Sequence, residues 1–112
     1  MKEKIKLSAA IREGAKLRPQ TFGAFFSNGC SCALGAAYEA ITGEKASGDK
    51  AVIKELDKYY LEVLNADITA ELPSEAKGKI APFRIYNAIT GLNDQCLLSR
   101  EQIADWLEQQ GF

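Results

Sequence analysis

The clearest hydrophobic periodicity in the chain lies between residues 49 and 64. Apolar side chains recur there at three- and four-residue intervals, at Val52, Ile53, Leu56, Tyr59, Tyr60, Val63 and Leu64. This spacing predicts an amphipathic helix with a charged opposite face, and Asp49 is a suitable N-cap. The next fifteen residues are less regular, and we expect Ile68 and Leu72 to anchor them.

Three more helices follow from shorter patterns. The first covers residues 7–17 and ends before Pro19, because proline disfavours helical geometry at the residue preceding it. Another is expected over residues 80–90, with Pro82 in its first turn and Gly91 ending it. The last begins at Ser99, where Ser-Arg-Glu-Gln fits a capping box with Gln102, and ends at Gly111.

The pair Asn28-Gly29 separates two short apolar runs and predicts a β-hairpin, because both residues tolerate positive φ. The hairpin should lead into a helix over residues 33–42. Most sides of that helix are apolar, which is typical of a central helix. Gly43 is its expected C-cap.

These elements predict a mainly α fold. At 112 residues, the chain is expected to form one domain over residues 1–112, with enough length for a single core. We therefore expect a single small domain of four to five helices with a short β-hairpin around residues 22–33. No internal repeat or linker interrupts the pattern.

Charge and hydropathy narrow the cellular locations expected for the protein. The net charge is −1, and acidic and basic residues are mixed along the chain. The first apolar residues are interleaved with lysines, which is not the pattern of a signal peptide. No apolar run approaches the roughly 18 residues of a membrane span, so we expect a cytoplasmic protein without membrane contact. Its three cysteines should then be reduced.

The chain contains no histidine. This excludes Ser-His-Asp and Cys-His catalysis and removes the commonest zinc and copper ligand. Neither familiar spacing of a glycine-rich phosphate loop occurs. We therefore expect no cofactor, and no spacing identifies a catalytic group; a carboxylate pair of Glu39 and Asp94 is the acid–base alternative.

Cysteine chemistry is a second alternative. Cys30 and Cys32 are separated by one residue, whereas zinc ligands are usually separated by two or more. With Cys96 and Asp94 they would complete a Cys3Asp set. A thiol at a helix N-terminus can also have a lowered pKa, which would make Cys32 reactive. The competing interpretation is that these are ordinary packed cysteines.

A third alternative is nucleic-acid binding. Residues 99–110 resemble the first helix of a helix-turn-helix, but the sequence given contains no second helix after them. The isoelectric point near 5.5 also argues against this function, because phosphate contacts dominate nucleic-acid affinity.

Two blocks of sequence resemble a family of small uncharacterised bacterial proteins. The first comprises residues 7–11, Arg-Pro-Gln at 18–20, Phe-Gly at 22–23 and Cys-Ala-Leu-Gly-Ala at 32–36. The second comprises Leu-Asn-Asp at 92–94, Arg-Glu-Gln-Ile-Ala at 100–104 and Trp106. Members often carry a central Cys-x-x-Cys pair and a histidine two residues after Asn-Asp. Here the central pair is missing and Cys96 occupies the histidine position. The resemblance implies no activity.

Both blocks surround expected helix starts, which predicts a packed junction. We expect Asn93 or Asp94 to accept hydrogen bonds from backbone amides near residues 29–33, and close approach there would explain a glycine inside a helix at position 35. The junction residues are Asn28, Gly29, Cys32, Gly35, Asn93, Asp94 and Ser99. The function expected is a non-catalytic interaction or accessory module that binds a protein partner or forms a homodimer, with Phe22, Phe25, Phe26, Tyr59 and Tyr60 as candidate contact residues.

Overall fold

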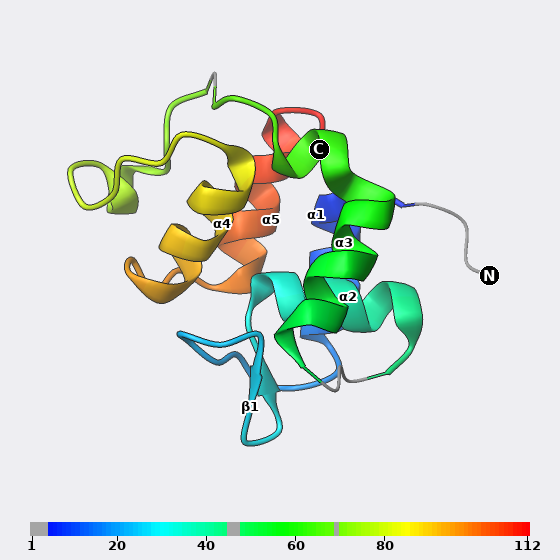
Figure 1. The fold of residues 1–112 in the computed structure, drawn as a ribbon. Helices are drawn as coiled ribbons and strands as arrows, with labels where there is room; N and C mark the ends of the chain where they lie inside the picture. Colours follow the sequence, from blue (N-terminus) through cyan, green and yellow to red (C-terminus); the bar gives the residue numbers. More distant parts are fainter. Residues whose placement is uncertain (1–4, 45–47, 69) are drawn as a thin grey trace.

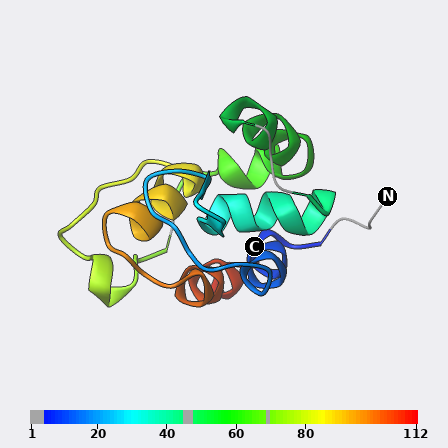
Figure 2. The same cartoon turned by 90° about the horizontal axis from the view of Figure 1, so that it is seen from below.

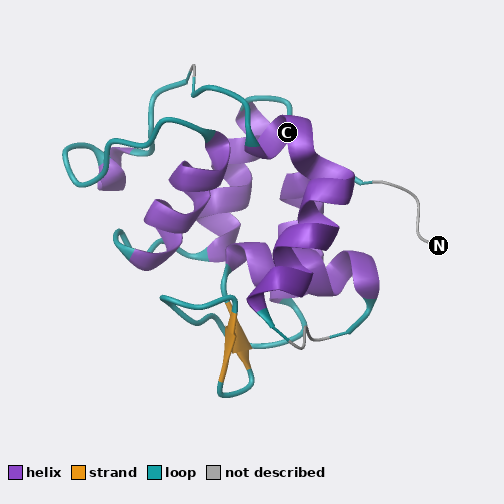
Figure 3. Cartoon of the chain, viewed as in Figure 1, coloured by secondary structure: helices purple, strands orange, loops and turns teal. Residues whose placement is uncertain are grey.

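The computed structural model describes residues 5–44, 48–68 and 70–112. In these ranges the fold is mainly α, with five helices and one two-stranded antiparallel hairpin, which confirms the predicted class (Figures 1 and 3). The helices are α1 (Leu7–Ala15), α2 (Ala33–Thr42), α3 (Asp49–Leu64), α4 (Ile85–Asp94) and α5 (Arg100–Gln109); the strands are β1 (Phe26–Ser27) and β2 (Cys30–Ser31), and η1 (Ser74–Ala76) is a short 3-10 turn. None of the helices described has the length and apolar character needed to span a membrane.

Helix α2 lies in the middle of the molecule, as its apolar composition predicted. It passes between α3 on one side and α1 and α5 on the other (Figure 2). Eight consecutive residues of α2, 33–40, are buried. The approach of α1 depends on Gly14, because a Cβ atom there would lie only 1.7 Å from the Ala36 carbonyl oxygen.

The hairpin forms where the sequence predicted it. Phe26 pairs with Ser31 and Ser27 pairs with Cys30, and Asn28 and Gly29 form the turn with φ of 49° and 77°. These two positive φ values suit the twist of a tight hairpin, which explains the Asn-Gly pair. Helix α2 has the predicted bounds, and Gly43 at its C-cap has φ of 81°.

Helix α3 differs from its prediction in two details. Its N-cap is Gly48, and Asp49 is the first helical residue. The buried residues are Val52, Leu56, Tyr60 and Leu64, whereas Ile53 is 41% exposed. The buried stripe is therefore narrower than the sequence suggested, with a period of four residues. A helix packed on one side of the core buries only such a stripe.

The predicted bounds of the fourth helix were wrong. The segment before Ile85 is not helical, because backbone pairing with residues 66–68 holds it extended: Ile68 N–H donates to the Phe83 carbonyl and Ile85 N–H to the Ala66 carbonyl. Pro82 therefore lies outside the helix. Gly91 does not end it, and α4 continues to Asp94. Asn93 and Asp94 thus occupy the last turn of α4 rather than a loop between helices.

Helix α5 begins with the predicted capping box. Ser99 Oγ accepts from Gln102 N–H at 3.1 Å, and Gln102 Oε1 accepts from Ser99 N–H at 2.9 Å. The helix is joined to α1 by Arg12, which forms ion pairs with Glu101, Asp105 and Glu108. The four side chains lie at the surface, where such a network contributes modestly to stability.

The five candidate aromatic residues are buried to different degrees. Tyr60 is only 2% exposed, and its hydroxyl donates to the Ile5 carbonyl at 2.8 Å. Phe25, Phe26 and Tyr59 are half-buried, and the Phe26 ring meets the Tyr38 ring edge-on. Phe22 is the most exposed of the five, at 46%.

Gly35 is required by the close approach of two backbones. A Cβ atom at this position would lie 2.2 Å from the Phe25 carbonyl oxygen, and this oxygen accepts a hydrogen bond from Cys32 N–H. The close neighbour is thus the loop before β1, whereas the sequence predicted the segment from Asn93 to Ser99. A glycine inside a helix lowers stability by about 1 kcal/mol relative to alanine.

Gly35→Ala should lower the free energy of unfolding by about 2 kcal/mol, measured by urea denaturation, because backbone atoms must move to admit the methyl group. Gly91→Ala is the matched control. It also lies inside a helix, but the nearest atom to its new Cβ is the end of the flexible Ile80 side chain, at 3.1 Å. The control should change stability by less than about 1 kcal/mol. Equal losses of stability in both variants would contradict the conclusion that the close approach of the Phe25 backbone requires glycine at position 35.

Candidate functional site

The side chain of Asn93 joins three segments of the chain. It is 1% exposed. Its Oδ1 accepts from Ala33 N–H at 3.1 Å and from the Gln20 amide at 2.8 Å. Its Nδ2 donates to the Thr21 carbonyl at 3.0 Å and to Asp94 Oδ1 at 2.7 Å. The expected hydrogen bond between the Asn93-Asp94 pair and the start of the second helix is therefore present.

The bond to Ala33 has a specific consequence for α2. Ala33 is the first residue of that helix, and the first amides of a helix have no partner within it. Asn93 supplies the partner for Ala33, and the Cys32 side chain supplies one for Gly35 N–H, with an N to Sγ distance of 3.4 Å. Helix α2 can therefore begin inside the core without an unsatisfied donor at these positions.

Asp94 and Gln20 also attach the segment before the hairpin to the end of α4. Asp94 Oδ1 accepts from Gly23 N–H at 2.9 Å. Gln20 Nε2 also donates to the Leu98 carbonyl, at 2.8 Å, so it connects the end of α4 with the turn that follows. The loop before β1 is thus fixed at several points by α4 and the α4–α5 turn.

Arg100 makes a second set of contacts from the start of α5. It is 7% exposed, and its guanidinium donates to Ser31 Oγ at 2.9 Å, to the Ser31 carbonyl at 3.2 Å and to the Arg18 carbonyl at 2.7 Å. Burial lowers the pKa of Arg100 from its ordinary value. No sequence pattern indicated this role, because an arginine at the start of a helix is usually solvated.

The acid–base alternative pairs Glu39 with Asp94, but in the structure Glu39 binds Arg18. It is 6% exposed, and both of its oxygens accept from Arg18 at 2.7 Å. A bidentate pair of this kind is strong and directional. It fixes the segment after α1 against α2, which is a structural role.

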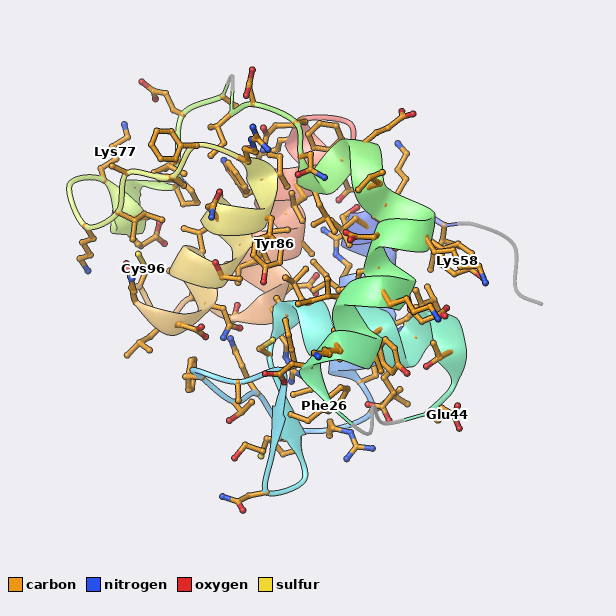
Figure 4. The ribbon with its side chains drawn as sticks, in the orientation of Figure 1. Phe26, Glu44, Lys58, Lys77, Tyr86 and Cys96 are labelled. Carbon is orange, nitrogen blue, oxygen red and sulfur yellow. The ribbon has the colours of Figure 1, made fainter. Side chains whose placement is uncertain are left out.

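The three cysteines have different surroundings. Cys32 caps α2 and is buried, Cys30 is half-buried on β2, and Cys96 lies on the turn after α4 at the edge of the molecule (Figure 4). Burial raises the pKa of the Cys32 thiol, and the nearby charge of Asp94 acts in the same direction. The lowered pKa expected for a reactive thiol is therefore wrong for Cys32.

The structure brings only some of the predicted junction residues together. Cys32, Asn93 and Asp94 line one pocket, and Asn28 and Gly29 lie at the hairpin tip. Ser99 bonds to Gln102 of its own helix, and the contact from this turn to the hairpin is made by Arg100. Among the residues described, no three acidic, cysteine or histidine side chains are grouped to hold a metal ion.

The pocket beside the junction has a volume of about 150 Å³. Its floor is formed by buried residues, among them Cys32 and Ile89, and its rim by exposed ones, among them Ala24 and Asp49. Tyr86 projects from α4 toward α3 and forms one wall (Figure 4). The sequence did not predict Tyr86 or Asp49 here, because they come from two helices whose relative positions depend on the tertiary fold.

Asn93→Ala should lower the free energy of unfolding by about 3 kcal/mol, because it leaves the Ala33 amide and the Thr21 carbonyl without their partner inside the core. Chemical denaturation monitored by circular dichroism measures this. Asn87→Ala is the control, since Asn87 is an exposed asparagine in the same helix. It should change stability by less than about 0.5 kcal/mol. A loss of similar size in both variants would refute the role of the buried amide.

Cys32 should react with iodoacetamide at least about tenfold more slowly than Cys30 and Cys96 at neutral pH, because its thiol is buried and its raised pKa disfavours the thiolate. Peptide mass spectrometry over a time course gives the three rates in one sample. Labelling of Cys32 first would contradict this prediction and support thiol chemistry at the junction.

Known proteins give no independent guide to this site. Comparison of the chain with protein-family models, with curated proteins and with solved structures found no significant match. The resemblance to an uncharacterised bacterial family therefore stays a prediction.

Proposed function

We propose that the chain is a non-catalytic interaction module that binds a protein partner. The contact surface proposed is the junction face, which we define as Phe22, Leu97 and the pocket lined by Cys32, Asn93 and Asp94. The observation that carries this proposal is the conformation and exposure of Leu97.

Leu97 contributes little to the fold in which it lies. Its φ is 55°, and its side chain is 62% exposed. The left-handed conformation costs a residue with a Cβ atom roughly 1–2 kcal/mol, so glycine or asparagine would suit the turn better. Because its side chain is mostly exposed, Leu97 also contributes little hydrophobic stabilisation to the fold. A strained apolar residue at the surface is consistent with a role in contact with another molecule.

Phe22 provides a second apolar side chain nearby. It is 46% exposed and lies in the loop that Asp94 binds through Gly23. This loop and the α4–α5 turn lie side by side in two perpendicular views (Figures 1 and 2). The hydrogen bonds of Gln20 join the same two segments. Phe22 and Leu97 are therefore presented on segments that the junction holds in place.

The polar groups at the junction support a binding role over a catalytic one. Asn93 uses both atoms of its amide in internal hydrogen bonds, and Arg100 donates to backbone and serine oxygens. A nucleophile would need an adjacent base and a lowered pKa, whereas the pKa of Cys32 is raised.

The alternatives have weaker support. The thiol or metal hypothesis needs Cys30, Cys32, Cys96 and Asp94 to be grouped, and the described part of the chain contains no such group of three. The nucleic-acid hypothesis needs cations on α5, but Arg100, its basic residue, is buried. Self-association through the junction face remains a specific outcome of the test below.

Leu97→Gly should raise the free energy of unfolding by about 1 kcal/mol, because glycine removes the strain of the positive φ. The same variant should weaken partner binding at least about tenfold, which corresponds to the loss of one buried leucine contact. A loss of binding in a stabilised protein cannot come from unfolding. Leu61→Ala is the control for binding, since Leu61 is 52% exposed on α3.

The partner can be found by placing a photo-crosslinking phenylalanine analogue at position 22 or 97, with position 61 as the control, in cells that make the protein. The proposal expects one adduct at 22 and 97 but not at 61. The purified partner should then show the affinity loss for Leu97→Gly in calorimetry. Equal adducts at all three positions, or unchanged affinity, would overturn the proposal. An adduct containing two copies of this chain would show that the junction face serves self-association and not the binding of a different protein.

A further inference from the structure

We propose that the pocket at the junction receives a lysine side chain of the partner protein, with its ammonium group between Asp49 and Asp94. This inference rests on the proposed function, which it extends by naming the group recognised.

The pocket has the size and walls for one short side chain. Cavities of about 150 Å³ can hold a molecule as large as benzene, so the four side-chain carbons and the nitrogen of lysine would fit. Ala24, Phe25 and Ile89 offer apolar surface to the aliphatic stem. Lysine side chains commonly bury this stem while the charged end meets a polar group.

The charged residues of the pocket are acidic. Asp94 is half-buried in its wall, Asp49 is exposed at its rim, and the described residues that line it include no lysine or arginine. Burial raises the pKa of the Tyr86 hydroxyl, and Cys32 and the carboxylates of Asp49, Asp57 and Asp94 raise it further. A cation entering the pocket would meet this negative field.

Tyr86 and the geometry of Asp94 favour an ammonium group in particular. The face of an aromatic ring attracts a cation, and a compact ammonium with three donors suits two separate carboxylates. Asp94 Oδ1 is occupied by Gly23 N–H and the Asn93 amide, which leaves Oδ2 to accept from a ligand. A planar guanidinium binds best where two oxygens of one carboxylate are available.

The first test is a titration of ¹⁵N-labelled protein with n-butylammonium chloride, which has the length of the lysine side-chain end. Neutral n-butanol and anionic pentanoate at the same ionic strength are the controls. The proposal expects millimolar binding of the ammonium alone, with amide shifts centred on Ala24, Tyr86 and Ile89. No shifts, or equal shifts with butanol, would overturn it.

Charge variants test the two carboxylates. Asp49→Asn and Asp94→Asn should each weaken butylammonium binding at least about fivefold, because each removes one negative charge. Asn at position 94 can still accept from Gly23 N–H, so the loop should stay in place. Asp67→Asn is the control, since Asp67 is exposed and does not line the pocket. Unchanged affinity in both pocket variants would contradict the proposal.

The source of the ammonium group is tested with a blocked Gly-Lys-Gly peptide and its Nε-acetylated form. The lysine peptide should shift the same amides as butylammonium, and the acetylated peptide should not. Binding of butylammonium without binding of the peptide would overturn the assignment to a protein partner. A crosslinked partner whose affinity is reduced by Leu97→Gly but unchanged by Asp49→Asn and Asp94→Asn would overturn this inference and leave the proposed function standing.

Discussion

The structure depends on one buried amide. Asn93 closes α4 against the start of α2 and against the segment before the hairpin, and it satisfies a helix amide that has no partner in its own helix. Only a side chain with both an acceptor and a donor can do this, because Oδ1 accepts from Ala33 and Gln20 while Nδ2 donates to Thr21 and Asp94. Aspartate would leave the Thr21 carbonyl unpaired, and leucine would leave both sides unpaired.

The reactive or charged side chains around Asn93 also have structural roles. Cys32 is used as a cap for α2, Arg100 holds the strand and the end of the α1 segment, and Arg18 binds Glu39. Each polar group offsets the cost of burying backbone donors and acceptors. At the edge of the junction Leu97 is exposed in a turn with positive φ, and this is where we propose that another molecule binds. The proposed binding function therefore follows from what the junction leaves free.

The features predicted from sequence were those with local causes. The Asn28-Gly29 turn, the bounds of α2 and the capping box at Ser99 each depend on residues close together in the chain, and all are present. The start of α4 was missed because pairing with residues 66–68 keeps the preceding segment extended, which no local pattern showed. Arg100 and the Tyr86 wall of the pocket depend on how distant elements pack, so sequence periodicity carries no signal for them. Asn93 was found because Asn-Asp near a helix start suggested side-chain bonds to backbone amides.

The most direct test of the central role of Asn93 is native-state hydrogen exchange at the Ala33 amide. This amide is the first of α2, and its acceptor is the Asn93 side chain, whereas Ala36 N–H is bonded within the backbone to the Cys32 carbonyl. If Asn93 closes the junction as described, Ala33 should exchange as slowly as Ala36 in the unmodified protein. Exchange of Ala33 at the rate of an unprotected amide, with Ala36 still protected, would contradict the account.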